Sequence, residues 1–207
     1  MPPQTSSSSP PPAQQDPLGV TCLLSHVAAR LERGSLFTIV HSGSSDYLRF
    51  LHDLIVRLLM DGHHVDVLDY RRAIKLVYVQ QVVNRKVATP LEHLGRLSLR
   101  VILDEQHALA EAQRLNRQSP STHGVSVLFF VDPSILLGRL VSRVKEAATA
   151  LRLQYEIAQV LAAKGYAVVV ADAGGRELHR AECLVPGQLA QSSSLLLQFL
   201  PHKVLIQ

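Results

Sequence analysis

The chain has 207 residues, of which 47% are apolar and 18% charged, and 21 Lys and Arg against 17 Asp and Glu give a formal net charge of +4. This length suits one domain of ordinary size with a tail, and the charge is far below that of a histone-like polycation, so nucleic acid is permitted but not required. The two cysteines exclude a disulfide scaffold and a four-cysteine zinc site, and no apolar run or leader predicts a membrane span or a secretory signal.

The first 17 residues (MPPQTSSSSPPPAQQDP) are rich in proline and serine and carry a single charge. Such a segment has too little apolar surface to form a core, so 1–17 is predicted to be a disordered tail. Residues 18–207 are predicted to form one core domain.

From residue 18 onward, helical and strand patterns alternate along the chain. Apolar residues at helical spacing predict helices over 23–31, 48–59 and 140–161. Short apolar and β-branched runs predict strands over 35–40, 65–68, 125–131 and 167–171, and a closing hairpin over 194–199 and 203–206. The stretch 70–118 is predicted to be mostly helical, with a break at Thr89-Pro90 that starts a new helix.

Strands that are apolar on both faces and separated by helices are typical of a mostly parallel sheet with helices on both sides. The predicted fold is therefore α/β with three layers and an antiparallel C-terminal hairpin. Ligands bind such sheets at the carboxyl ends of the strands. Three strand ends are candidates, after Val40, Leu68 and Val131. The small-residue loop 41–47 (HSGSSDY) after the first leads into a helix, and Asp132 follows the third.

Four segments resemble the RecA/RadA recombinase superfamily and its non-catalytic paralogues. Residues 31–39 (LERGSLFTI) resemble the strand that leads into the Walker A loop of that family, and 127–134 (VLFFVDPS) resemble its Walker B strand. The helix and strand around 161–170 and the closing part 186–206 are similar to later elements of the family. The resemblance implies a RecA-like P-loop-type core, in which Asp132 would be the carboxylate near Mg²⁺.

The loop departs from a working Walker A motif, G-x-x-x-x-G-K-[ST], in which the lysine neutralises the phosphates and the hydroxyl binds Mg²⁺. Asp46 and Tyr47 stand where the lysine and the hydroxyl residue would fall, and no lysine occurs between Gly34 and Asp61. A carboxylate beside a triphosphate replaces attraction by repulsion, on the order of 4 kcal/mol per unit pair at about 4 Å and an effective dielectric of about 20. We therefore expect a pseudo-ATPase with no catalytic residue and no cofactor.

Two features keep nucleotide binding open as an alternative. Gly43, Ser44 and Ser45, with Asp132, form a degenerate nucleotide site, since small residues before a helix can hold a phosphate on backbone N–H groups. Asp69, which follows the predicted strand at 65–68, could orient the attacking water in place of the family's glutamate. A weakly active Mg-ATPase is therefore one alternative function.

The resemblance also implies two loops that face DNA. Arg139 and Arg143 follow the Walker B-like strand, and Arg176 and Arg180 follow the next strand along the chain. These regions face single-stranded DNA in the recombinases, so the four arginines are predicted to neutralise DNA phosphates. The plain alternative for Arg139 and Arg143 is a solvated helix face.

A third basic group, Arg71, Arg72 and Lys75, stands at the predicted start of a helix. Positive charge there opposes the helix dipole, which points to a functional contact or an interface. Metal and nucleophile sites have less support, because the ten histidines show no ligand spacing and Cys183 has no activating base near it in the sequence.

Together these observations predict a non-catalytic recombinase paralogue that acts in homologous recombination or DNA repair. It would bind single- or double-stranded DNA and a recombinase-fold partner subunit, in a nucleus or in the cytoplasm or nucleoid of a prokaryote, with no membrane contact. Besides the weak ATPase, the remaining alternative is a RecA-fold protein-binding or inhibitory module that does not touch DNA.

Overall fold

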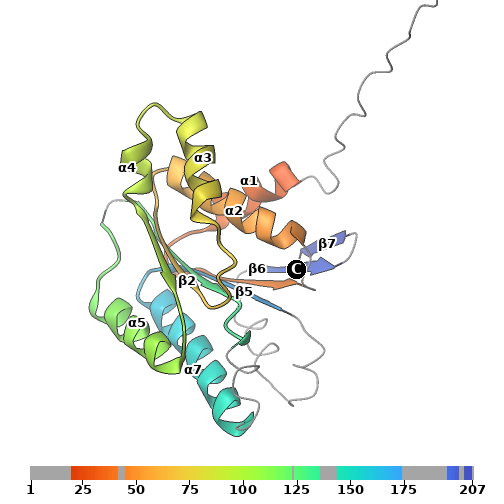
Figure 1. The fold of residues 1–207 in the computed structure, drawn as a ribbon, viewed down its shortest axis with the longest axis vertical. Helices are drawn as coiled ribbons and strands as arrows, with labels where there is room; N and C mark the ends of the chain where they lie inside the picture. Colours follow the sequence, from red (N-terminus) through yellow and green to blue (C-terminus); the bar gives the residue numbers. More distant parts are fainter. Residues whose placement is uncertain are drawn as a thin grey trace, which may run out of the picture.

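The computed structural model describes residues 20–41, 45–122, 124–135, 144–173, 195–200 and 203–206. The predicted tail, 1–17, lies outside the described residues. The chain has an α/β fold with a parallel sheet between two layers of helices (Figure 1).

The sheet has seven strands in the order β3-β2-β4-β5-β1-β6-β7. All neighbouring strands run parallel except β6 and β7, which pair antiparallel from Leu197 with Ile206 to Leu200 with Lys203. The strands are β1 Leu36–His41, β2 His64–Asp69, β3 Leu97–Val101, β4 Ser126–Val131, β5 Ala167–Ala173, β6 Leu195–Leu200 and β7 Lys203–Ile206.

Helices cover both faces of the sheet, with α1 to α4 on one side and α5 and α7 on the other (Figure 1). They are α1 Val20–Arg30, α2 Ser45–Met60, α3 Leu76–Lys86, α4 Pro90–Leu94, α5 Glu105–Arg117 and α7 Val144–Ala163. None of the helices in the described part of the chain has the length and apolar character needed to cross a lipid bilayer.

The core has two parts, one on each face of the sheet, and β4 contributes to both. Val127, Phe129 and Val131 belong to the cluster beneath α1, α2 and α3, whereas Leu128 and Phe130 belong to the cluster beneath α5 and α7. Successive side chains of a strand point to opposite faces. A strand that is buried on both sides therefore needs an unbroken apolar run, which residues 127–131 supply.

The prediction of a mostly helical stretch over 70–118 is wrong in one respect, because it contains the edge strand β3. Every residue of β3 is half-buried, and its sequence LSLRV alternates apolar and polar residues. That alternation is the strand signal, but it spans only five residues between two helices. The break at Thr89-Pro90 is confirmed, with Pro90 at the start of α4, although the Thr89 side chain makes no capping hydrogen bond.

Candidate functional site

The carboxyl ends of β1, β2 and β4 bring four side chains together. His41 is the last residue of β1, Asp132 follows β4, Tyr47 lies in the first turns of α2, and Arg71 follows β2. β5 lies between β1 and β4 in the sheet, so the group spans strands that are not neighbours. We call these four residues the Asp132 site.

Both oxygens of the Asp132 carboxylate are hydrogen-bonded to side chains. The His41 Nε2 donates to Oδ1 at 2.7 Å, and the Tyr47 hydroxyl donates to Oδ2 at 2.6 Å. The Arg71 Nη1 lies 3.8 Å from Oδ2 on the outer side. Asp132 is only 2% exposed, and a buried carboxylate is stable only when donors of this kind replace its lost hydration.

The two donors also pack against each other. The His41 and Tyr47 rings are stacked, with centroids 3.4 Å apart and planes 7° from parallel, and each residue is 1% exposed. Burial, followed by the negative charge of Asp132, raises the pKa of Tyr47 above its ordinary value. Tyr47 therefore remains a hydroxyl donor throughout the physiological range.

The backbone at Asp132 adopts a left-handed conformation, with φ of 56°. Its N–H donates to the Ala171 carbonyl of β5 at 2.7 Å, which continues the pairing of β4 with β5. Non-glycine residues with such a positive φ cost on the order of 1–2 kcal/mol, although aspartate tolerates it better than most.

Two features of this arrangement bear on Mg-ATP binding. Mg²⁺ binds carboxylate oxygens, and each Asp132 oxygen already accepts one hydrogen bond, so a metal ion would share or displace these contacts. The Tyr47 ring occupies the space at the start of α2 next to that carboxylate, and no cationic residue lies in 45–48 to hold a phosphate. Asp132, one of the residues predicted for a nucleotide site, is thus bound by His41 and Tyr47.

Asp69 is not placed to orient a water molecule. It is fully buried, and its carboxylate accepts hydrogen bonds from the backbone N–H groups of Arg71, Ala73 and Ile74 at 3.0, 3.1 and 2.8 Å. The alternative role given to Asp69 from the sequence is therefore wrong. Its carboxylate holds the loop between β2 and α3 in place.

A second buried carboxylate, that of Asp172, lies within β5. Asp172 accepts hydrogen bonds from the Ser134 hydroxyl on Oδ1 and from the Tyr155 hydroxyl on Oδ2. Tyr155 belongs to α7, so this contact ties that helix to the carboxyl edge of the sheet. The segment after Asp132 is anchored at Ser134 by the same carboxylate.

The predicted site residues divide into two groups. Asp132 is at the predicted strand end, and Ser45 begins α2 at the surface. Gly43, Ser44 and the predicted DNA-binding arginines lie outside the described residues, namely Arg139, Arg143, Arg176 and Arg180.

The sequence does not predict that His41 and Tyr47 bind Asp132. One signal was present: His41 and Tyr47 flank the small-residue loop, so both start at the strand end where Asp132 was expected. Across the described part of the chain, no group of three or more His, Cys, Asp or Glu residues is arranged to hold a metal ion.

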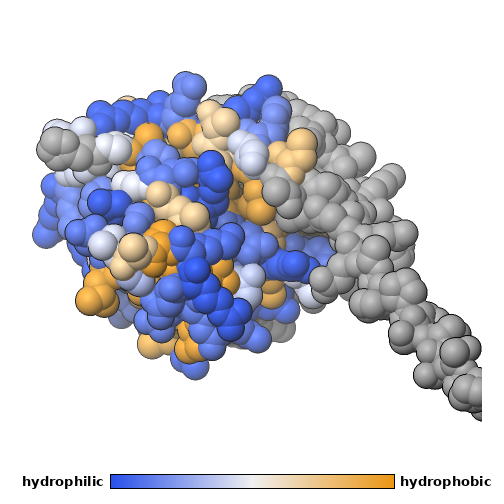
Figure 2. Space-filling view, turned by 90° about the horizontal axis from the view of Figure 1, so that it is seen from above, coloured by the Kyte–Doolittle hydropathy of each residue, from blue (hydrophilic) through white to orange (hydrophobic). Residues whose placement is uncertain are grey.

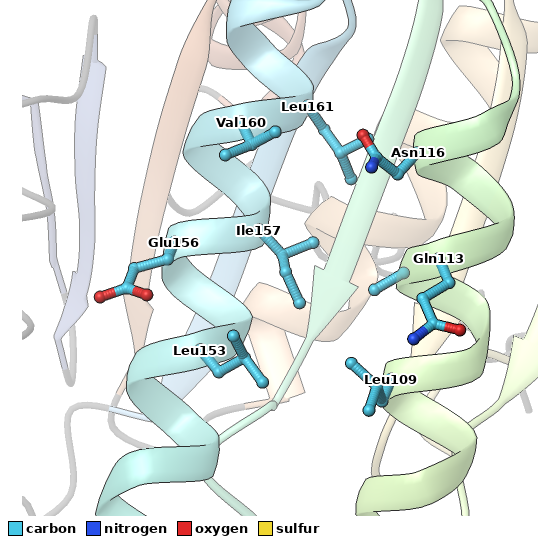
Figure 3. A pocket seen from close by; sticks show the side chains of 9 residues that line it. Leu109, Gln113, Asn116, Leu153, Glu156, Ile157, Val160 and Leu161 are labelled. Atoms are coloured by element: carbon cyan, nitrogen blue, oxygen red, sulfur yellow. The ribbon is translucent and has the colours of Figure 1, made fainter.

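A separate surface feature lies on the other face of the sheet. A groove of about 300 Å³ runs between α5 and α7 and is lined mainly by apolar side chains (Figure 3). Leu109, Leu153 and Val160 are 41%, 39% and 51% exposed there, whereas Glu156 points away from the groove in Figure 3. Contiguous exposed apolar residues of this kind mark interaction surfaces.

The surface over α1 to α4 is more mixed. Figure 2 shows this side of the molecule, where small hydrophobic patches lie among hydrophilic residues. The exposed apolar residues of α3 and α4 are Leu76, Val77, Tyr78 and Leu91.

No protein-family model matches this chain, and no curated protein matches its sequence. The functional assignment therefore depends on the Asp132 site and on the surfaces around it.

Proposed function

We propose that this chain is a non-catalytic paralogue of the RecA-like recombinases, which acts by binding DNA and a recombinase-fold partner subunit. The observation that carries the proposal is the closure of the Asp132 site. A carboxylate stands at the strand end where the resemblance expects a Mg²⁺ ligand, yet His41 and Tyr47 take both of its oxygens.

The strand order supports the RecA-like part of the proposal. β1, which precedes the Walker A-like loop, and β4, which precedes Asp132, are separated by β5. This differs from the two common doubly wound orders, 3-2-1-4-5-6 and 2-1-3-4-5, in which β1 lies beside β2. His41 and Tyr47, which flank the degenerate loop in the sequence, nevertheless lie beside Asp132, as expected of a P-loop-type fold.

The absence of turnover follows from charge and space. A nucleotide would have to displace the Tyr47 hydroxyl from Asp132, leaving a buried carboxylate with one fewer donor. Removing a hydrogen bond to a buried charged group costs about 1.5–3 kcal/mol, before any repulsion from Asp46 is added. The first turn of α2 supplies no positive charge to offset that cost, since its only charged residue is Asp46.

The DNA-binding part of the proposal is supported by where the basic segments start. β4 and β5 are adjacent and parallel, so both strands end at the same edge of the sheet. The segments that carry Arg139 and Arg143, and Arg176 and Arg180, begin there in the sequence. Four arginines that start from one edge would give a salt-dependent affinity for DNA.

The partner-binding part is supported by the groove between α5 and α7. Its apolar residues recur at helical spacing, three apart on α5 (Leu109 and Ala112) and four and three apart on α7 (Leu153, Ile157 and Val160). An amphipathic helix of a partner fits a groove of this form, because its own i, i+3, i+4 and i+7 anchors would face both walls. We assign this groove to the partner subunit.

Affinity purification of the tagged full-length chain from its own cells, with nuclease treatment, tests the proposal. We expect a recombinase-fold subunit to co-purify, and we expect the purified chain to bind DNA. If a partner co-purifies but the chain binds no DNA, the alternative function is favoured, in which this chain is a protein-binding module that uses the same groove. Recovery of a protein of an unrelated fold would contradict the recombinase assignment.

A further inference from the structure

The loop between β2 and α3 presents three cations to solvent. Arg71, Arg72 and Lys75 are all exposed, and they lie within five consecutive positions of the chain. Arg71 is about half exposed at 51%, so only part of its side chain faces the Asp132 site. We call these three residues the basic loop.

The basic loop is held rigidly from inside. The Asp69 carboxylate accepts hydrogen bonds from the backbone N–H groups of Arg71, Ala73 and Ile74. The Ile74 side chain packs in the core with 7% exposure. Arg72 has a φ of 61°, a left-handed conformation that exposed arginine adopts only when the surrounding contacts impose it. A rigid loop loses little conformational entropy when it binds a ligand.

A histidine of α2 fixes the far end of the loop. The Lys75 backbone N–H donates to His52 Nε2 at 2.8 Å, and His52 Nδ1 lies 2.6 Å from the Leu48 carbonyl. A carbonyl can only accept, so Nδ1 carries the proton and Nε2 is the acceptor. The neutral His52 thus connects the loop to α2 while the Lys75 side chain remains exposed.

The positive charge of the loop is not neutralised locally. No carboxylate of the described residues lies within ion-pair distance of Arg72 or Lys75, and the first turn of α3 contains no acidic residue. Some exposed arginines elsewhere have a carboxylate one turn away, as Arg57 has Asp61 at 2.8 Å and Arg152 has Glu156 at 2.9 Å. In the basic loop, Arg71 lies 3.8 Å from the buried Asp132 carboxylate, and Arg72 and Lys75 add two further cations beside it.

We propose that the basic loop binds the phosphodiester backbone of nucleic acid, which extends the proposed DNA-binding function to residues that the resemblance does not assign. β2 lies directly beside β4, so the loop opens from the same sheet edge as the predicted DNA-facing segments begin. Arginine donates two parallel hydrogen bonds to a phosphate, and Lys75 adds a point charge. Both kinds of contact suit a polyanion with regularly spaced phosphates.

Tyr78 favours single-stranded nucleic acid over an acidic protein as the ligand. It is 37% exposed and follows Lys75 by three positions, which places both on one side of the start of α3. Bases stack on exposed aromatic rings next to cations, whereas carboxylates gain little from such a ring.

The test is a titration of a fluorescein-labelled oligothymidylate with the full-length chain and with the triple variant Arg71→Gln, Arg72→Gln and Lys75→Gln. Three lost phosphate contacts should lower the slope of log affinity against log salt by about 2, because each contact on a single strand contributes about 0.7. The ratio of the wild-type affinity to the affinity of the triple variant should therefore fall about 20-fold between about 50 and about 200 mM salt.

The matched control removes three other exposed cations, through Arg30→Gln, Arg85→Gln and Lys86→Gln, and therefore makes the same change in net charge. We expect the slope of the control to stay close to that of the wild type. Equal slopes for both triple variants would overturn the role of the basic loop while leaving DNA binding in place. A wild type that binds no oligothymidylate would overturn both proposals.

A competition experiment separates nucleic acid from acidic protein. Polyglutamate should displace the oligothymidylate much less effectively than unlabelled oligothymidylate does, because it offers neither bidentate phosphates nor stacking bases. If polyglutamate displaced the labelled oligothymidylate as effectively as unlabelled oligothymidylate does, and the triple variant bound both polymers equally weakly, the basic loop would be assigned to an acidic protein. That result would contradict the proposal. Unfolding by urea, followed by circular dichroism, checks that the triple variant is folded.

Discussion

Tyr47 donates its hydroxyl hydrogen to the Asp132 carboxylate at 2.6 Å, joining residues 85 positions apart in the chain. Under the proposed resemblance, Tyr47 takes the position of the Mg²⁺-binding hydroxyl of a Walker A loop, and Asp132 that of the Walker B carboxylate. Here the two buried side chains are joined by a direct hydrogen bond.

Tyr47→Phe should lower the free energy of unfolding by about 2 kcal/mol, because it removes a hydrogen bond to a buried charged group and leaves the ring in place. The matched control is Tyr78→Phe, which removes the same kind of bond to Asp53 from a ring that is 37% exposed. We expect less than about 1 kcal/mol there. Urea unfolding measures both, and equal losses would contradict the burial argument.

Alkaline pH should destabilise the fold through Tyr47. Its folded-state pKa is raised, whereas in the unfolded chain it is near 10.0, so above that pH the unfolded state releases a proton that the folded state keeps. The contribution of Tyr47 to the free energy of unfolding is fully present below about pH 10. Above that pH it falls by up to about 1.4 kcal/mol per pH unit.

The pH dependence of urea unfolding checks this expectation. Tyr70, whose pKa is also raised by burial, should contribute a similar slope, so Tyr47→Phe should reduce the slope without abolishing it. An unchanged slope in Tyr47→Phe would show that this hydroxyl is not buried against a charge.

Asp69→Asn should loosen the basic loop while keeping its cations. The amide of asparagine offers one acceptor oxygen where the carboxylate offers two, and three backbone N–H groups depend on that carboxylate. Hydrogen exchange at the amides of Arg71, Ala73 and Ile74 should be slow in the wild type and at least about tenfold faster in the variant, the equivalent of about 1.4 kcal/mol. Fast exchange in the wild type would contradict a rigid loop.

Leu153→Asp or Val160→Asp should abolish recovery of the partner subunit, because each places a charge in the groove between α5 and α7. Both side chains are already partly exposed, so stability should change by less than about 1 kcal/mol. Leu91→Asp is the matched control, since Leu91 is 84% exposed on α4, away from the groove. Loss of the partner in all three variants, or in none, would contradict the assignment of the groove.

Much of the fold could be predicted from the sequence because it depends on local pattern. The run VLFFV at 127–131 is apolar on both faces, which already indicates a central strand of a covered sheet, and Asp132 at its end follows directly. β3 is the exception, since an edge strand needs only one neighbour and carries a short, half-polar pattern that the flanking helices obscure.

The interior of the site could not be predicted in the same way. Tyr47 is amphipathic, and its sequence position fits an exposed first turn of α2 as well as a buried one. In the structure the buried Tyr47 bonds to Asp132 and stacks on the His41 ring. These contacts join residues 41–47 to Asp132, two segments that are remote in the chain, so no local pattern contains them.

Isothermal titration of the full-length chain with a non-hydrolysable ATP analogue and Mg²⁺ tests the closure of the Asp132 site most directly. We expect no saturable heat, with the wild type indistinguishable from Asp132→Asn. Saturable binding by the wild type that needs Mg²⁺ and disappears in Asp132→Asn would show that His41 and Tyr47 give way to a nucleotide, and it would contradict the account.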